Sequence, residues 1–197
     1  MFLILNNMNS KKIIMVGLMS ILLTACGGGG GGTTTVVPDD TTTEVKLDVE
    51  DLNIKLDSSY SIIIENQSIP FSETGSLKLD VDKNNTTPII VANKEGRTIL
   101  LGRKFSGDNQ AEISLESTAE VFILRTTAFF GVKITDDKEL SKRIRSHKVF
   151  PELVNQLKKG INEGSTCPTD PKCNPWALVL SSKITSTLDM KDLVGDK

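Results

Sequence analysis

The hydrophobic pattern changes its period once along this chain of 197 residues, close to Ile113. Before that point, apolar and polar residues alternate in short runs separated by turn residues, which is typical of half-buried β-strands. After it, apolar residues recur every three to four positions, as they do along one side of an α-helix. Strands followed by helices predict an α+β architecture. We expect an N-terminal antiparallel β-sandwich-like sheet followed by a small C-terminal helical bundle.

The β part is expected over residues 45–115 and should contain six or seven short antiparallel strands. The clearest alternation is in residues 77–82, where leucine and valine alternate with lysine and aspartate. Residues 93–96, Asn-Lys-Glu-Gly, separate two β-rich runs at the spacing of a tight hairpin. Glycine occupies the position that needs a positive φ.

The helical part is expected over residues 116–194 and should contain four helices. Each start is marked by a capping group or a proline: Ser117-Thr118-Ala119-Glu120, Thr135-Asp136-Asp137, Pro151 and Asn174-Pro175. Glycine at position 164 should end the third helix. The fourth helix has an apolar stripe that we expect to face the core, made of Trp176, Val179, Leu180, Ile184 and Leu188.

The first 25 residues have the pattern of an export signal. Lys11 and Lys12 precede a run of 13 uncharged residues, 13–25, which is too short to span a membrane stably and has the length of a signal-peptide apolar region. Residues 23–26, Leu-Thr-Ala-Cys, resemble the lipobox of bacterial lipoproteins. An ordinary secretory signal or an uncut short anchor would not explain the position of Cys26. Translation from Met8 instead of Met1 would give a conventional short basic region.

The lipobox resemblance covers residues 11–26 and implies that residues 1–25 are removed and Cys26 is acylated. Two or three acyl chains, such as palmitate, hold a protein on a membrane where one alone holds it poorly. Gly27 after the cysteine, instead of aspartate, implies an outer-membrane lipoprotein that faces the periplasm or the cell surface; a Gram-positive surface lipoprotein is the alternative.

Residues 26–44 are expected to form a disordered tether after the lipidated cysteine. Six consecutive glycines, 27–32, are followed by runs of threonine. Such a segment cannot bury enough apolar surface to offset its ordering entropy. Residues 27–44 would span about 25 Å as a flexible chain.

The other two cysteines, Cys167 and Cys173, are close in sequence and read as a disulfide in an exported chain. A redox-active pair is the alternative, but the spacing is not Cys-x-x-Cys. A zinc site would need more ligands than two thiols and the distant His147.

Catalytic signatures are absent from the sequence. His147 is the only histidine and lies in a basic stretch expected at a helix end, where an exposed capping role explains it. Neither Gly-x-Ser-x-Gly nor Ser-x-x-Lys occurs. Residues 80–86 begin like an EF-hand loop, but Asn85 and Val91 replace its glycine and glutamate. We expect no catalytic residues, no metal site and no cofactor.

The balance of acidic and basic residues limits the classes of partner that this chain could bind. Without its first 25 residues the chain has 21 basic and 25 acidic residues, which excludes the basic footprint of a nucleic-acid-binding protein. Two groups of cations remain, which we expect to be solvated surface: Lys94, Arg97, Arg103 and Lys104 near the hairpin, and Lys138, Lys142, Arg143, Arg145 and Lys148 on the second helix. Alternatively, one shared face could meet anionic lipid head groups or an acidic partner.

These observations predict a lipid-anchored cell-envelope protein that is a non-enzymatic binding or adaptor module. Its expected partners are the membrane, through the acyl chains on Cys26, and another envelope protein. The alternatives are a small periplasmic hydrolase or accessory subunit, and a carrier of a hydrophobic ligand. A polar cleft with convergent acids would favour the enzyme, an apolar cavity the carrier, and an exposed apolar patch the adaptor.

Overall fold

The computed structural model describes residues 42–65, 67–71, 76–82, 84–126, 129 and 132–194. The expected signal segment, the lipidation site Cys26 and the tether up to residue 41 lie outside the described residues. Residues 42–44, also expected in the tether, belong to a β-strand, so the predicted end of the tether at residue 44 is wrong. The described residues belong to one compact unit. This unit combines a seven-stranded mixed sheet with four helices, so the predicted α+β class is confirmed.

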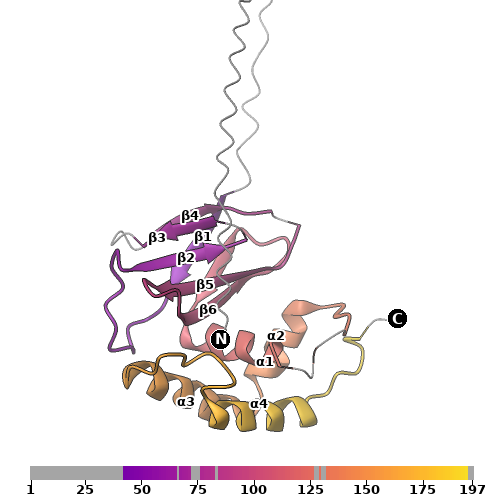
Figure 1. The fold of residues 1–197 in the computed structure, drawn as a ribbon. Helices are drawn as coiled ribbons and strands as arrows, with labels where there is room; N and C mark the ends of the chain where they lie inside the picture. Colours follow the sequence, from indigo (N-terminus) through magenta and orange to yellow (C-terminus); the bar gives the residue numbers. More distant parts are fainter. Residues whose placement is uncertain are drawn as a thin grey trace, which may run out of the picture. The chain divides into compact units, whose positions relative to one another are not determined.

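The strands form one sheet in the order β3-β2-β5-β6-β7-β1-β4 (Figure 1). Their bounds are β1 (Thr42–Leu47), β2 (Tyr60–Ile64), β3 (Gln67–Pro70), β4 (Ser76–Asp80), β5 (Thr87–Asn93), β6 (Thr98–Lys104) and β7 (Gln110–Ile113). The expected tight hairpin joins β5 to β6, with Gly96 at φ +74°. The expectation of an all-antiparallel sheet is wrong for one pair, because β1 and β7 are parallel. Alternation reveals which residues of a strand share a face, and it carries no information about the neighbouring strand.

A first apolar core lies against the sheet and includes residues of the loop that follows β1. Its buried members are Val45, Leu52, Leu56, Ile62, Ile64, Val81, Ile89, Val91, Leu100, Ala111, Ile113, Leu115 and Ile161. The residues from β2 and β5 are spaced two apart, as one face of a strand requires. Leu115 and Ile161 come from helices, so this core also attaches the helical layer to the sheet.

Four helices follow the sheet in the chain: α1 (Leu115–Leu124), α2 (Asp137–Arg145), α3 (Phe150–Asn162) and α4 (Pro175–Thr187). Asp136 caps α2 and Asn174 caps α4, as predicted. The predicted start of α1 is wrong: Ser114, and not Ser117, is the N-cap, and the two serines exchange hydrogen bonds at 2.8 and 3.0 Å. No helix among the described residues is long and apolar enough to cross a membrane.

Helix α1 lies between the strands and the pair α3 and α4 (Figure 1). On the sheet side, the hydroxyls of Ser117 and Thr118 donate to the carbonyl of Leu101 in β6, at 2.8 and 3.0 Å. On the other side, α1 contributes Phe122 to a second core with the other helices. Every turn of α1 is therefore enclosed, which fixes its side chains relative to β6 and β7.

The predicted disulfide between Cys167 and Cys173 is confirmed, and it closes the loop between α3 and α4. Within this loop, Thr169 donates to the carbonyl of Thr98 at the start of β6, at 3.1 Å. Asn174, which follows the loop, donates to the carbonyl of Pro168 at 3.2 Å and accepts from Ala177 at 3.1 Å. The closed loop thus positions the N-terminus of α4 against the sheet.

Replacing Cys173 by serine should reduce the free energy of unfolding by about 2 kcal/mol, the loop-closure value for a seven-residue ring. Urea denaturation without reductant measures the loss. Cys167→Ser should give the same value, and the double variant should lose no more than either single variant. Additive losses in the double variant would mean that the two sulfurs act separately.

Candidate functional site

A buried carboxylate, Glu120 of α1, lies between two arginines. Its side chain is 1 % exposed. Nε of Arg145 in α2 donates to Glu120 Oε2 at 2.7 Å, and Ser141 Oγ donates to the same oxygen at 2.8 Å. The guanidinium of Arg103 in β6 forms an ion pair with Glu120 Oε1. One carboxylate therefore joins the sheet to two helices.

The two arginines make further contacts at the sheet edge of this cluster. Arg145 Nη1 lies 3.3 Å from Oε2 of Glu112 in β7. Arg103 Nη2 donates to the carbonyl of Asp137 at 3.2 Å, and its guanidinium carbon lies 4.3 Å from the ring centroid of Phe105. A cation over an aromatic face is stabilised by the ring quadrupole. Each guanidinium is thus held in one orientation.

Burial is the largest single influence on the pKa of Arg103 and of Arg145, but the net shift has opposite directions in the two residues. It lowers the pKa of Arg103 below the ordinary arginine value, against the opposing charge of Glu120. For Arg145 burial acts in the same direction, but the hydrogen bond and charge of Glu120, followed by those of Glu112, raise the pKa above the ordinary value. The carboxylates therefore stabilise Arg145 more completely than Arg103.

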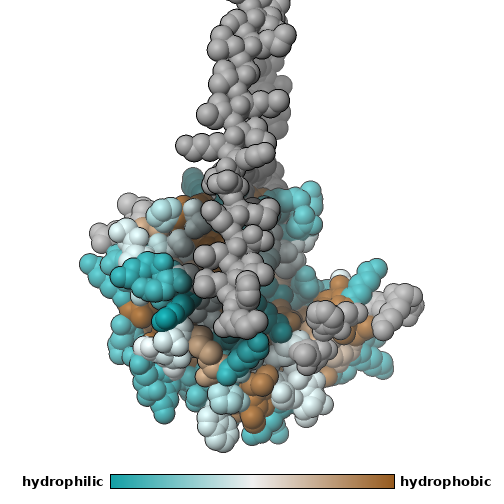
Figure 2. All heavy atoms as spheres, in the orientation of Figure 1, coloured by the Kyte–Doolittle hydropathy of each residue, from teal (hydrophilic) through white to brown (hydrophobic). Residues whose placement is uncertain are grey.

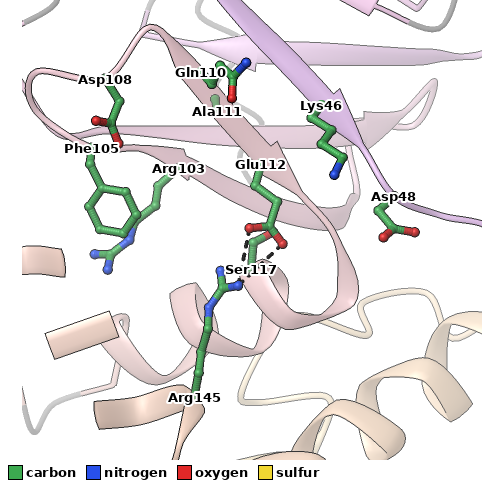
Figure 3. Close-up of a pocket in the computed structure, with 10 residues that line it drawn as sticks. All are labelled: Lys46, Asp48, Arg103, Phe105, Asp108, Gln110, Ala111, Glu112, Ser117 and Arg145. Atoms are coloured by element: carbon green, nitrogen blue, oxygen red, sulfur yellow. Dashed lines mark hydrogen bonds and ion pairs between the residues drawn. The ribbon is translucent and has the colours of Figure 1, made fainter. Parts of the chain in front are cut away.

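A pocket of about 260 Å³ opens beside this cluster, where β1 and β7 run parallel (Figure 3). Its charged lining residues are Lys46, Asp48, Arg103, Asp108, Glu112 and Arg145. Glu112 is paired with Arg145, and Asp108 accepts from Lys138 at 2.6 Å. Positive and negative charges balance around the pocket, so it does not select an ion of either sign.

The chemistry available in the pocket is limited by its hydrogen bonds. Ser117 Oγ, which lines it, already donates to the Leu101 carbonyl. The Ser117 hydroxyl is therefore held by the backbone of β6. Among the described residues, no three His, Cys, Asp or Glu side chains lie close enough together to hold a metal ion.

A second, larger hollow of about 410 Å³ lies where α1 and α3 begin. We call it the α3 groove. Its apolar lining residues are Leu115, Phe150, Pro151 and Val154. The first two are almost fully buried, so Pro151 and Val154 supply most of the exposed apolar surface. Its charged lining residues are Asp51, Glu116, Arg145 and Lys158. Asp51 and Lys158 form an ion pair at 3.1 Å, and Glu116 is exposed.

Helix α4 buries part of the predicted apolar stripe: Leu180 and Ile184 are buried as predicted, and Leu188 packs against the helical core. Trp176 is 66 % exposed and Val179 is 44 % exposed, so assigning these two residues to the core stripe was wrong. The buried residues of α4 are Ala177, Leu180, Ser181 and Ile184. Two of these are small, so α4 packs close to its neighbours when this side faces inward.

The exposed side of α4 forms an apolar surface, which we call the α4 face. It consists of the exposed Trp176, Leu178 and Val179, with Lys172 before the helix and Lys183 within it, both exposed. In Figure 2, apolar residues reach the surface over α4 in the lower part of the view. Contiguous exposed apolar patches are typical of interaction sites, whereas single exposed apolar residues are common on any protein surface.

The predicted surface group of cations is partly internal. Lys104 is 0 % exposed and Arg103 is 8 % exposed, so the expectation that both are solvated is wrong. Lys104 Nζ donates to the carbonyls of Asp82, Asn85 and Phe105, at 3.0, 3.2 and 3.3 Å. The loop that begins like an EF-hand is therefore ordered by a lysine ammonium.

His147 follows α2, beyond the cap residue Ser146, and is half-buried. Its Nδ1 accepts from the backbone N–H of Val149 at 3.2 Å, and its Nε2 lies 2.9 Å from Thr187 Oγ1. Because Nδ1 accepts, the hydrogen of the neutral ring is on Nε2 and points to Thr187. His147 thus joins the α2–α3 turn to the end of α4, and it does not line the pocket in Figure 3.

No known protein family, curated protein or solved structure matches this chain. Of the predicted site residues, Cys167 and Cys173 form their disulfide, and Cys26 lies outside the described residues. Glu120 was missed as a site residue because it was assigned to a helix cap. The signal that could have identified it is an acid within the otherwise apolar segment 119–124.

Proposed function

We propose that this protein is a lipid-anchored component of the bacterial cell envelope that acts as a non-enzymatic binding module. The α4 face carries the binding part of this proposal, because Trp176 is mostly solvent-exposed and the exposed Val179 lies three positions away on the same side of the helix. The sequence around Cys26 supports the anchor. In this proposal, acyl chains on Cys26 attach the protein to the outer membrane, and a flexible tether that ends before β1 gives the body freedom to reach its partner.

We further infer that the body consists of a sandwich-like sheet, residues 45–115, and a small helical bundle, residues 116–194, that work as one rigid support. The enclosure of α1 supports this view, since α1 contacts the sheet, α3 and α4. A rigid support lowers the entropic cost of presenting the α4 face to a partner.

A periplasmic hydrolase is the second candidate, because Asp48, Asp108 and Glu112 converge on the charged pocket. The ion pairs of Asp108 and Glu112 with Lys138 and Arg145 favour the binding function over this one. A carrier function receives less support, since Phe122, which would line its cavity, is fully buried in the helical core.

The anchor is tested by Cys26→Ala in the full-length chain expressed in bacterial cells. The wild-type protein should fractionate with membranes and carry acyl chains on Cys26. The variant should be released from the membrane or remain as the unprocessed precursor, because the acylated atom is missing. Membrane fractionation and mass spectrometry of the mature N-terminus measure both results.

Cys167→Ser is the matched control, since it also removes a thiol and should leave fractionation unchanged. An acylated Cys26→Ala protein that fractionates normally would contradict the anchor, as would a wild-type protein without acyl chains.

A further inference from the structure

The chain carries two surfaces whose chemistry is complementary, the α4 face and the α3 groove. We propose that the α4 face of one copy docks into the α3 groove of a second copy, so that the protein associates head to tail. This inference deepens the proposed function, since it rests on the α4 face as the binding surface and names a second copy of this chain as the occupant.

The groove combines apolar lining residues with two acids and two cations, and of these four charges only Glu116 has no ion pair among the described residues. Leu115 and Phe150 form the floor, and Val154 forms part of the wall. Glu116 and Asp51 supply carboxylates, and Asp51 is 79 % exposed although it is paired with Lys158. The other cation at the groove, Arg145, is already held by Glu120 and Glu112. A ligand that brings an apolar side chain together with a positive charge therefore fits this surface.

The α4 face offers an apolar anchor with positive charge on either side. Helix α4 contains no acidic residue. Lys172 and Lys183 have no ion pair within the described part of the chain, and the nearby Asp170 carboxylate accepts from the backbone N–H of Lys172. Tryptophan is the residue type that most often dominates the energy of a protein interface, when it enters a pocket from which water is excluded.

The two surfaces share no residue, so both are available to other copies of the chain. The groove is lined by α3 residues between Phe150 and Lys158, and no residue of α4 lines it. The α4 face begins after the disulfide loop, which follows the other end of this 13-residue helix. The helix is about 20 Å long at 1.5 Å per residue. A contact between unlike surfaces is heterologous, and it continues from copy to copy unless the rotation closes a ring.

Photo-crosslinking between two full-length copies in intact cells tests the proposal. One copy carries a photo-reactive amino acid at Asn155, which is exposed and lines the groove, and the other carries a different epitope tag. We expect an adduct that contains both tags. Trp176→Ala in the tagged partner should reduce its yield at least tenfold, whereas the same change in the photo-reactive copy should leave that adduct intact.

A charge exchange makes the test specific for the α4 face and the α3 groove. Lys183→Glu in the partner should weaken the adduct at least threefold, and adding Glu116→Lys to the photo-reactive copy should restore it. Two controls accompany this test. Ser186→Ala on α4 should give as much adduct as the wild-type protein, and a photo-reactive residue at Lys78 in β4 should give no adduct.

The proposal is overturned if Asn155 gives no adduct with the second copy, gives one that persists with Trp176→Ala, or captures only a different protein. Membrane fractionation of the Cys26→Ala variant is a separate measurement. If the wild-type protein is anchored but gives no adduct, self-association is rejected and the proposed lipid anchor is unaffected.

Discussion

Glu120→Gln should lower the free energy of unfolding by about 3–5 kcal/mol, the cost of removing one partner from a buried ion pair. Glutamine retains the shape of the side chain but leaves Arg103 and Arg145 without the charge that compensates their burial. Arg103 should carry most of the penalty, because it is the more deeply buried of the two. Urea denaturation followed by circular dichroism measures the change.

The matched control is Glu139→Gln on α2, which makes the same chemical change in a more exposed carboxylate paired with Arg143 and Lys142. Its loss should stay below about 1 kcal/mol. Similar losses in the two variants would reject a special role for the buried cluster. Replacing Arg103, Glu120 and Arg145 together by apolar residues should recover much of the stability, because no buried charge is then left unpaired.

Lys104→Met should cost about 3 kcal/mol, because hydrogen bonds to a charged donor contribute more than neutral ones and several are lost together. Methionine fills the space of the lysine stem and donates nothing to the carbonyls of Asp82, Asn85 and Phe105. Thermal denaturation gives the size of the effect. Hydrogen exchange at the N–H of Ser106, which donates to Thr86 Oγ1, reports on the loop itself.

Lys94→Met is the control for Lys104→Met, since Lys94 lies in the β5–β6 hairpin and its side chain is 76 % exposed. It should change stability by less than about 0.5 kcal/mol. A loss for Lys104→Met no larger than for Lys94→Met would mean that water replaces the ammonium at these carbonyls without cost.

The sequence predicted those parts of the fold that are determined by neighbouring residues. Asp136 and Asn174 cap their helices because their side chains reach the first free backbone N–H groups. Gly96 marks the hairpin because its backbone has a positive φ. The disulfide was predictable for the same reason, since its two cysteines are six positions apart.

Features that depend on distant residues were not predictable from the sequence. The sequence of α4 allows two rotations of the helix about its axis, which bury different sets of apolar residues. Which set is buried depends on how closely α4 packs against the other helices. In the sequence, Arg103 and Lys104 look like surface residues. The fold brings Arg103 to Glu120, and it brings Lys104 to the carbonyls of Asp82, Asn85 and Phe105. The candidate site was therefore the least predictable part, since its residues come from β6, β7, α1 and α2.

The parallel pairing of β1 with β7 has a consequence for the order in which the protein is assembled. β1 takes its neighbours from β4 and from β7, which ends at Ile113. When the chain is supplied from its N-terminus, β1 is present well before β7. The pairing of β1 with β7 is therefore a late step in folding, and contacts so distant in sequence form slowly. Until β7 has formed, β1 can pair with β4 alone, so the other edge of β1 stays open during this interval.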